Sequence, residues 1–263
     1  AQIRYLARHD VLTGLPNRTA NAEMTPHSKD APDALPLPAT GDVVAAWPQE
    51  PQQLFLLLHG ADQHPADWLP LAQAIALHFP QGLVASLATP VALLRGIDNK
   101  PSDMPTAVEA LHERVRCWQT HTGLGFDRTA LITQGMAASA ALRAIMRHAD
   151  LCARLFAVGG QLDGRAAPIS EQTSLHWLHG DKDTSLSLAH ARETAQHLQA
   201  LDVDFTLDLL PGSCTADTPV LHQRVLELLQ GHVPRRLWKE ALASAGTLED
   251  VCQAPSANKG DWH

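Results

Sequence analysis

The stretch TALITQGMAASAAL, residues 129–142, decides how the rest of the chain is interpreted. Its first four residues predict a buried strand, and the small apolar residues at its end predict a helix. Residues 133–137 form the tight turn between them. Such a turn brings the strand and helix backbones close together and therefore needs small residues on both flanks. Thr133 and Ala137 fill those flanks, and Gly135 stands at the centre.

Strands and helices alternate on both sides of this stretch. Apolar runs predict further strands at residues 54–58, 82–88, 154–158, 174–178 and 203–210. Helical spacing of apolar residues predicts helices at residues 66–79, 106–120, 186–201 and 220–229, and a short one between Pro234 and Leu242. The alternation predicts an α/β fold with a doubly wound, mostly parallel sheet. Sites in such sheets lie at the carboxyl ends of the strands.

Composition divides the chain into four segments. Residues 1–18 form an amphipathic segment with a turn, and residues 19–51 are a proline-rich linker with a short strand at Val43–Ala46. Residues 52–245 form the α/β domain, and residues 246–263 are a polar tail.

Charge and cysteine usage exclude several classes of function. The net charge is −8 and no basic stripe is present, so we expect no nucleic-acid binding. No apolar run approaches the ~20 residues of a membrane-spanning helix, and no signal peptide is visible. The four cysteines are scattered without a CxxC pair, which favours a reducing cytoplasm. The fifteen histidines do not cluster along the sequence, so we predict neither a metal nor a cofactor.

The first 18 residues carry a specific motif. They resemble the opening of diguanylate cyclase domains, D-x-L-T-G-L-x-N-R. The matching residues are Asp10, Leu12, Thr13, Gly14, Leu15, Asn17 and Arg18. The Gly-Gly-Asp/Glu-Glu-Phe hairpin that the family implies is absent downstream. The resemblance therefore implies a truncated remnant and not a complete cyclase.

Three other motifs lie in residues 52–242, namely LFLLLHG at 54–60, TALI at 129–132 and LHGDKD at 178–183. With them the chain resembles the carboxylesterase/phospholipase family of α/β-hydrolases, the relatives of acyl-protein thioesterases. The resemblance implies an α/β-hydrolase fold and a Ser-Asp-His triad in that chain order. It also implies an oxyanion hole and hydrolysis of acyl esters or thioesters.

The nucleophile position falls in the tight turn. The ungapped register places it on Gly135, which has no side chain that could attack a substrate. A register shifted by two residues places it on Thr133, which would require a shorter strand. Ser139 also has small neighbours, but it lies in the predicted helix and is interpreted as an ordinary helix serine. The acid position falls on Asp183, so this chain has the residue type that the family carries there.

The base position falls in the loop of residues 211–218, which contains no histidine. The ungapped register places it on Thr215, with Cys214 as the neighbouring alternative, and neither side chain replaces an imidazole as a proton shuttle near neutral pH. His222 lies about two helical turns further on. The oxyanion hole needs only backbone N–H groups, and the family positions are Ala61 and Met136.

These positions predict an esterase-family fold that has lost its catalytic chemistry and acts as a binding or interaction module. Its partner would be a small acyl ester or another small molecule. The alternative is a weak acyl ester or thioester hydrolase with a displaced nucleophile. In that alternative Thr133 or Ser139 attacks, and His222 or His59 acts as the base.

Overall fold

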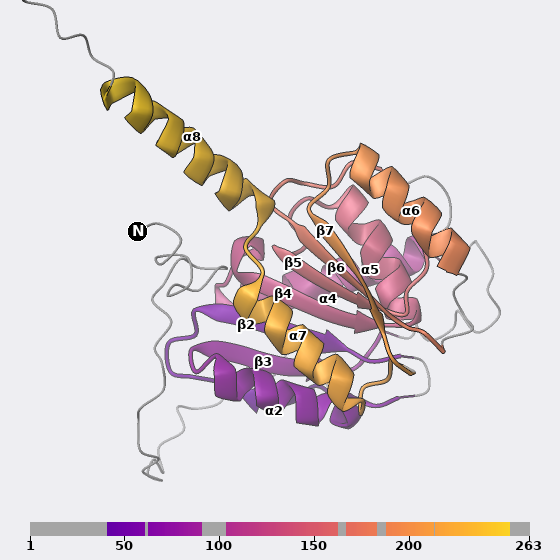
Figure 1. Cartoon of the computed structure of the whole chain (residues 1–263). Helices are drawn as coiled ribbons and strands as arrows, with labels where there is room; N and C mark the ends of the chain where they lie inside the picture. The colour runs from indigo at the N-terminus through magenta and orange to yellow at the C-terminus, as the bar shows by residue number, and fades with distance from the viewer. Residues whose placement is uncertain are drawn as a thin grey trace, which may run out of the picture.

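A computed structural model describes residues 41–60, 63–90, 104–162, 167–182, 188–212 and 214–252 of the chain (Figure 1). The predicted remnant at residues 1–18 lies outside this part, as do most of the predicted linker and the last residues of the predicted tail. Two positions discussed above, Ala61 and Asp183, also lie outside the described residues.

The described residues form one seven-stranded sheet in the order β1-β3-β2-β4-β5-β6-β7. The strands are β1 Val43–Ala46, β2 Gln53–Leu58, β3 Gly82–Leu87, β4 Thr129–Gln134, β5 Arg154–Val158, β6 Ser174–Gly180 and β7 Phe205–Leu210. Strand β1 pairs antiparallel with β3, and every other neighbouring pair is parallel. The predicted doubly wound, mostly parallel sheet is therefore confirmed.

Helices cover both faces of the sheet. They are the 3₁₀-helix η1 Pro65–Trp68, α2 Leu69–His78, α4 Met104–Thr122, the 3₁₀-helix η3 Phe126–Arg128, α5 Met136–Arg147, α6 Leu188–Ala200, α7 Pro219–Gly231 and α8 Arg235–Cys252. In Figure 1, α2 and α7 lie on one face, and α4, α5 and α6 lie on the other. Helix α8 projects away from the sheet and extends beyond the short helix that the sequence predicts.

The apolar residues of strand β2 contribute alternately to the two hydrophobic cores, one on each face of the sheet. Leu54, Leu56 and Leu58 belong to the core under α4 and α5. Phe55 and Leu57 belong to the core under α2 and α7. Successive side chains of a strand point to opposite faces, so a strand covered on both sides must be apolar throughout.

The aspartate before β1 ties the edge of the sheet to α4. The side chain of Asp42 is buried and forms an ion pair with Arg114. It also accepts hydrogen bonds from the backbone N–H of Ala88 at 2.9 Å and from Nε1 of Trp118 at 3.1 Å. These contacts make residues 42–46, which the sequence places in the linker, part of the packed sheet.

Two polar groups fasten the far end of the sheet to α7 and α8. The buried guanidinium of Arg154 donates to the carbonyls of Leu228 and Leu229 at 3.0 Å and to that of His232, so it caps the last turn of α7. The carboxylate of Asp204 accepts from the hydroxyl of Ser174 at 2.6 Å and from the backbone N–H of Arg235, the first residue of α8, at 3.1 Å.

The same region holds two titratable groups with shifted pKa values. Burial alone would raise the pKa of Asp204, but hydrogen bonds from His232, Ser174 and the Arg235 backbone outweigh burial and hold it at about 2. Burial, together with the nearby His232 ring and the Arg154 cation, lowers the pKa of His176 well below its usual value.

Candidate active site

The turn between β4 and α5 has the geometry of a nucleophile elbow. Strand β4 continues through Gln134, which pairs with Val158 of β5, and α5 starts directly after Gly135. Gly135 has φ 61° and ψ −121°, a conformation that is strained for a residue with a Cβ. Its N–H donates to the carbonyl of Val158 at 2.9 Å, and its carbonyl accepts from Ser139 N–H at 3.0 Å. The strained position at the strand-to-helix turn is where α/β-hydrolases carry their nucleophile.

Small residues behind the elbow allow this close approach. A Cβ placed on Gly160 would lie 2.7 Å from the Cβ of Ala138 and 2.9 Å from the backbone nitrogen of Ser139. The loop after β5 and the first turn of α5 therefore meet backbone to backbone. In front of the elbow the situation is the reverse, because a Cβ on Gly135 would meet none of the described residues within 4 Å.

The two alternative hydroxyls are engaged inside the fold. Thr133 lies within β4, is fully buried, and donates its hydroxyl to the carbonyl of Phe156 at 3.2 Å. The hydroxyl of Ser139 donates to the carbonyl of Gly135 at 3.2 Å and accepts from the backbone N–H of Gln161 at 2.9 Å. The shorter strand that an attack by Thr133 requires is not observed, because β4 runs two residues beyond Ile132.

The loop after β7 lies against the elbow. The side chain of Gln134, next to Gly135, donates to the carbonyl of Cys214 at 3.1 Å. Thr215, the predicted base position, follows Cys214 directly. Its hydroxyl donates to Asp217 at 2.6 Å, which is a local turn contact before α7. The structure thus brings the predicted nucleophile and base positions to the same edge of the sheet.

The loop after β6 joins this edge through backbone contacts. Asp181 N–H donates to the carbonyl of Leu210 at 2.8 Å, and Lys182 N–H donates to that of Gly212 at 3.2 Å. The Asp181 carboxylate accepts from the Gly212 N–H at 2.6 Å. Asp183 lies outside the described residues, but the loop that leads into it is held beside the predicted base loop.

His222 and His59, the two alternative bases, both form contacts with backbone groups. Nε2 of His222 lies 2.5 Å from the carbonyl of Ala216. Nε2 of His59 accepts from Thr89 N–H at 3.3 Å, so its Nδ1–H donates to the carbonyl of Gly60 at 2.7 Å. Burial lowers the pKa of His59, although its hydrogen bond to Gly60 opposes this shift.

The turn after β2 is shaped by a residue that the sequence analysis did not single out. The side-chain oxygen of Gln63 accepts from Gly60 N–H at 3.1 Å and from Nε1 of Trp68 at 3.3 Å. It therefore orients the backbone beside the predicted oxyanion position. Nothing in its local sequence signals this role, because its partners become neighbours only in the folded turn.

Comparison with known proteins identifies the family. No protein-family model matches the chain. Esterase YpfH of Escherichia coli strain K12 is 30% identical over 220 residues, which cover 79% of this chain and 95% of that protein. The chain belongs to the YpfH esterase family.

Solved structures show that this esterase-family chain has the α/β-hydrolase fold. Esterase PE8 superposes with a TM-score of 0.59 at 19% identity and covers 69% of this chain and 93% of its own. A phospholipase/carboxylesterase from Dyadobacter fermentans DSM 18053 gives a TM-score of 0.56 at 17% identity and covers 73% and 96%. The elbow described above therefore belongs to an esterase-type sheet.

Within the described part of this esterase-family chain, no helix is long and apolar enough to cross a bilayer. The same residues contain one group of His and Glu side chains close enough to bind a metal, Glu109, His112 and His148. It lies between α4 and α5, away from the elbow. Spacing along the sequence does not predict it, because His112 and His148 are far apart in the chain and meet only when the helices pack.

Proposed function

We propose that this esterase-family chain is catalytically degenerate and that its elbow edge serves as a binding site for a small ligand. The observation that carries the proposal is Gly135 at the strained centre of the elbow. A hydrolase of this fold needs a nucleophilic side chain at that point. Glycine offers none, while the backbone frame that would aim one is intact.

The predicted base loop supports the same proposal. Thr215 takes part in a local turn with Asp217, and a threonine hydroxyl does not accept and return a proton near neutral pH as an imidazole does. His222 faces the carbonyl of Ala216. Restoring a base from these residues would require the loop to rearrange.

The expected loss of rate is large. Removal of a triad nucleophile lowers turnover about a million-fold, and backbone donors with binding alone leave about a thousand- to ten-thousand-fold over the reaction in water. Loss of the base adds little to this, because triad residues act as a unit. A chain with both positions substituted is therefore better suited to binding than to turnover.

The ligand class follows from the groups that remain. We propose that the backbone N–H groups of Met136 and Ala61 bind a carbonyl or carboxylate oxygen. The N–H of Met136 is in the first turn of α5, where backbone donors have no acceptor within the helix. The space in front of Gly135 leaves room for such an oxygen. A short acyl ester, or the carboxylate that its hydrolysis would produce, fits these donors.

The first experiment tests the loss of activity. The wild-type chain is incubated with p-nitrophenyl acyl esters and, separately, with a fluorophosphonate probe. We expect no turnover above the rate without protein and no covalent label. Labelling that disappears in Thr133→Ala or Ser139→Ala would refute the proposal and support a weak hydrolase with a displaced nucleophile.

The second experiment tests binding. Butyrate or hexanoate is titrated into the isotope-labelled chain, and the amide resonances of the elbow are followed. We expect saturable shifts for Met136 that are absent for residues of α8. An inert protein whose Met136 resonance does not respond to any acyl carboxylate or ester would contradict the binding function.

Two further expectations remain predictions from the sequence. The resemblance of residues 1–18 to a diguanylate cyclase opening falls outside the described residues, and the family found here is an esterase family. We expect no cyclic-di-GMP synthesis. We also propose a cytoplasmic location, which the free thiols of Cys117 and Cys152 support.

A further inference from the structure

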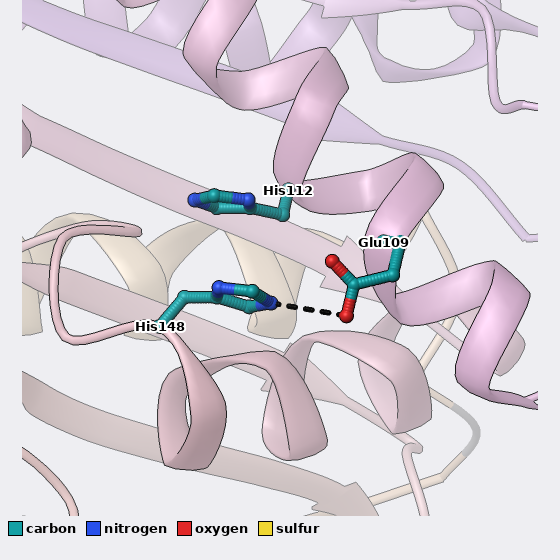
Figure 2. Close-up of side chains that lie close together, drawn as sticks. All are labelled: Glu109, His112 and His148. Atoms are coloured by element: carbon teal, nitrogen blue, oxygen red, sulfur yellow. Dashed lines mark ion pairs between the residues drawn. The ribbon is translucent and has the colours of Figure 1, made fainter.

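A histidine pair joins the outer surfaces of α4 and α5. Glu109 and His112 lie one turn apart on α4, and His148 follows the end of α5 (Figure 2). One possible ligand atom from each of the three side chains lies within 4.8 Å of the others. Helix α5 starts at the elbow and is 12 residues long, so this group is about 18 Å from the candidate active site.

The two imidazole rings are stacked, with centroids 3.8 Å apart and planes 8° apart. Nε2 of His148 lies 3.4 Å from Oε1 of Glu109. Nε2 of His112 lies 3.4 Å from Oδ1 of Asp150. Each ring therefore faces a carboxylate of its own.

Neither of these two 3.4 Å contacts is a hydrogen bond to the Nε2 atom of the histidine. The Nε2 atoms of His112 and His148 are both buried and have no hydrogen-bond partner among the described residues. Native structures rarely leave buried polar nitrogens in this state without a reason, such as an ion that binds there.

We propose that Glu109, His112 and His148 form a binding site for a divalent transition-metal ion of the Zn²⁺ class. Two imidazoles and one carboxylate are a donor set that suits zinc, cobalt and nickel and not the harder Mg²⁺ or Ca²⁺. The 3.4 Å separation of His148 Nε2 from Glu109 Oε1 also fits. Two ligands of a tetrahedral zinc with bonds of ~2.1 Å are themselves separated by roughly 3.4 Å.

The orientation of His112 assigns its two nitrogens. In Figure 2 the rings enter the stack from opposite sides, and the nitrogen beside the Cβ of His112 lies on the Glu109 side. This nitrogen, Nδ1, is the metal ligand in our proposal. Nε2 then keeps its hydrogen and points to Asp150. A metal-bound histidine whose other N–H faces a carboxylate is the usual way in which proteins fix the ring.

Binding requires a small movement of the rings. Because their planes are nearly parallel, their lone pairs lie in separate planes and cannot meet at one ion. A tilt about χ2 of each histidine brings them together, and this torsion has a broad, soft profile. The helices themselves need not move.

The surroundings allow an ion to enter. Glu109 lines an open groove of about 430 Å³ together with Glu113 and Arg147. The guanidinium of Arg147 lies 3.8 Å from the Glu109 carboxylate, and both side chains are half exposed. Such an exposed pair is weak, so a divalent cation can displace it. Water fills the remaining coordination position from the groove.

The test measures Zn²⁺ affinity by calorimetry and Co²⁺ binding by visible absorption, on the whole chain at neutral pH. We expect one ion per chain at this site and a visible band that reports imidazole ligands. His112→Ala and His148→Ala each weaken binding by about 100-fold and remove the band, and Asp150→Asn weakens binding by roughly tenfold.

Two matched controls keep the result specific. His78→Ala removes an exposed histidine on α2, and Glu113→Gln removes a neighbouring carboxylate of the same groove; both should keep wild-type affinity. Glu109→Gln preserves the size of the side chain and should weaken binding at least tenfold. Zn²⁺ should also raise the melting temperature of the wild type and not that of either histidine variant.

Wild-type affinity in both histidine variants would overturn the proposal, because the ion would then be bound elsewhere. An equal loss in His78→Ala would overturn it as well, because it would show unspecific binding to surface histidines. Circular dichroism confirms that each variant is folded. Since the site lies at the far end of α5, failure of this test leaves the proposed function of the elbow unaffected, and the reverse is also true.

Discussion

The assignment of the elbow and the base loop can be tested by restoring what they lack. The perturbation is the double variant Gly135→Ser with Thr215→His. Within the described part of the chain a Cβ on Gly135 meets nothing within 4 Å, so the serine side chain has room there. Its only stability cost is the backbone conformation at φ 61°, which is about 1–3 kcal/mol for a residue with a Cβ.

The second substitution removes two local side-chain contacts. The hydroxyl of Thr215 loses its hydrogen bond to Asp217 and its contact with the hydroxyl of Thr218 at 2.9 Å, both in the turn before α7. The loop stays beside the elbow, because the bond from Gln134 to the carbonyl of Cys214 is unchanged. A domain of this size loses about 2–4 °C of melting temperature per kcal/mol, so the serine substitution should lower it by roughly 2–12 °C.

The assay is hydrolysis of p-nitrophenyl butyrate by the purified variants. The matched control is Gly135→Ala with Thr215→His, which has the same backbone strain and the same new imidazole but no hydroxyl. Loss of a triad serine costs about a million-fold. A restored triad that works at only about a thousandth of full efficiency would thus still exceed the control roughly a thousandfold.

A folded double variant that is no more active than its alanine control would contradict the placement of the nucleophile at position 135 and the base at position 215. At least one of the two registers would then be wrong, or the acid predicted at Asp183 would not reach the new imidazole. Fluorophosphonate labelling separates these outcomes. A labelled serine without turnover leaves Gly135 as the nucleophile position and moves the error to the base loop.

Further predictions concern the groups that hold the sheet to its helices, and urea unfolding measures each of them. Arg154→Met leaves the carbonyls at the end of α7 without their charged donor and should destabilise the chain by at least about 3 kcal/mol. Asp42→Asn weakens the buried pair with Arg114 and should cost about 2–3 kcal/mol, with no effect on acyl carboxylate binding. Asp204 has a pKa of about 2 in the folded chain, below its value in the unfolded chain, so the unfolded chain binds the proton first as the pH falls. The stability that the Asp204 carboxylate contributes is therefore present above pH ~4 and is lost towards pH ~2. Asp204→Asn should not show this loss of stability. The pKa of buried His176 is lowered, so stability should already fall as the pH drops below about 6.5, and His176→Gln should remove this earlier part of the acid transition.

Periodicity predicted the regular elements because burial on two faces leaves a signal in consecutive residues. The apolar run of β2 is buried from end to end, and its strand was placed within one residue. The end of β4 was missed by two residues, since Thr133 and Gln134 are polar and join the sheet through backbone pairing, both with β5 and Thr133 also with β2. Hydrophobicity does not report such pairing.

Contacts between residues far apart in the chain could not be predicted from the spacing of residues along the sequence. Asp42 stands in a proline-rich stretch that predicts a linker. Its ion pair with Arg114 could not be predicted, because the two residues are 72 positions apart in the chain. The histidine pair was missed for the same reason. His112 and Glu109 are recognisable as helical neighbours, but His148 reaches them only after α4 and α5 have packed together.

The geometry of the elbow does not depend on a side chain at position 135. The turn is held by the bonds from Gly135 N–H to Val158 and from Ser139 N–H to Gly135, and by the approach of Gly160 to Ala138. None of these contacts uses the side chain at position 135. Glycine adopts the observed φ without the strain that serine would bear there, so exchange of serine for glycine at this position removes chemistry and relieves the backbone at the same time. The backbone strain in an active elbow is thus needed only to orient the nucleophilic side chain. A chain that binds its ligand without attacking it does not need this strain. On this argument Gly135→Ser should destabilise the protein even if it restores hydrolysis, and a serine variant as stable as the wild type would show that the strain lies elsewhere.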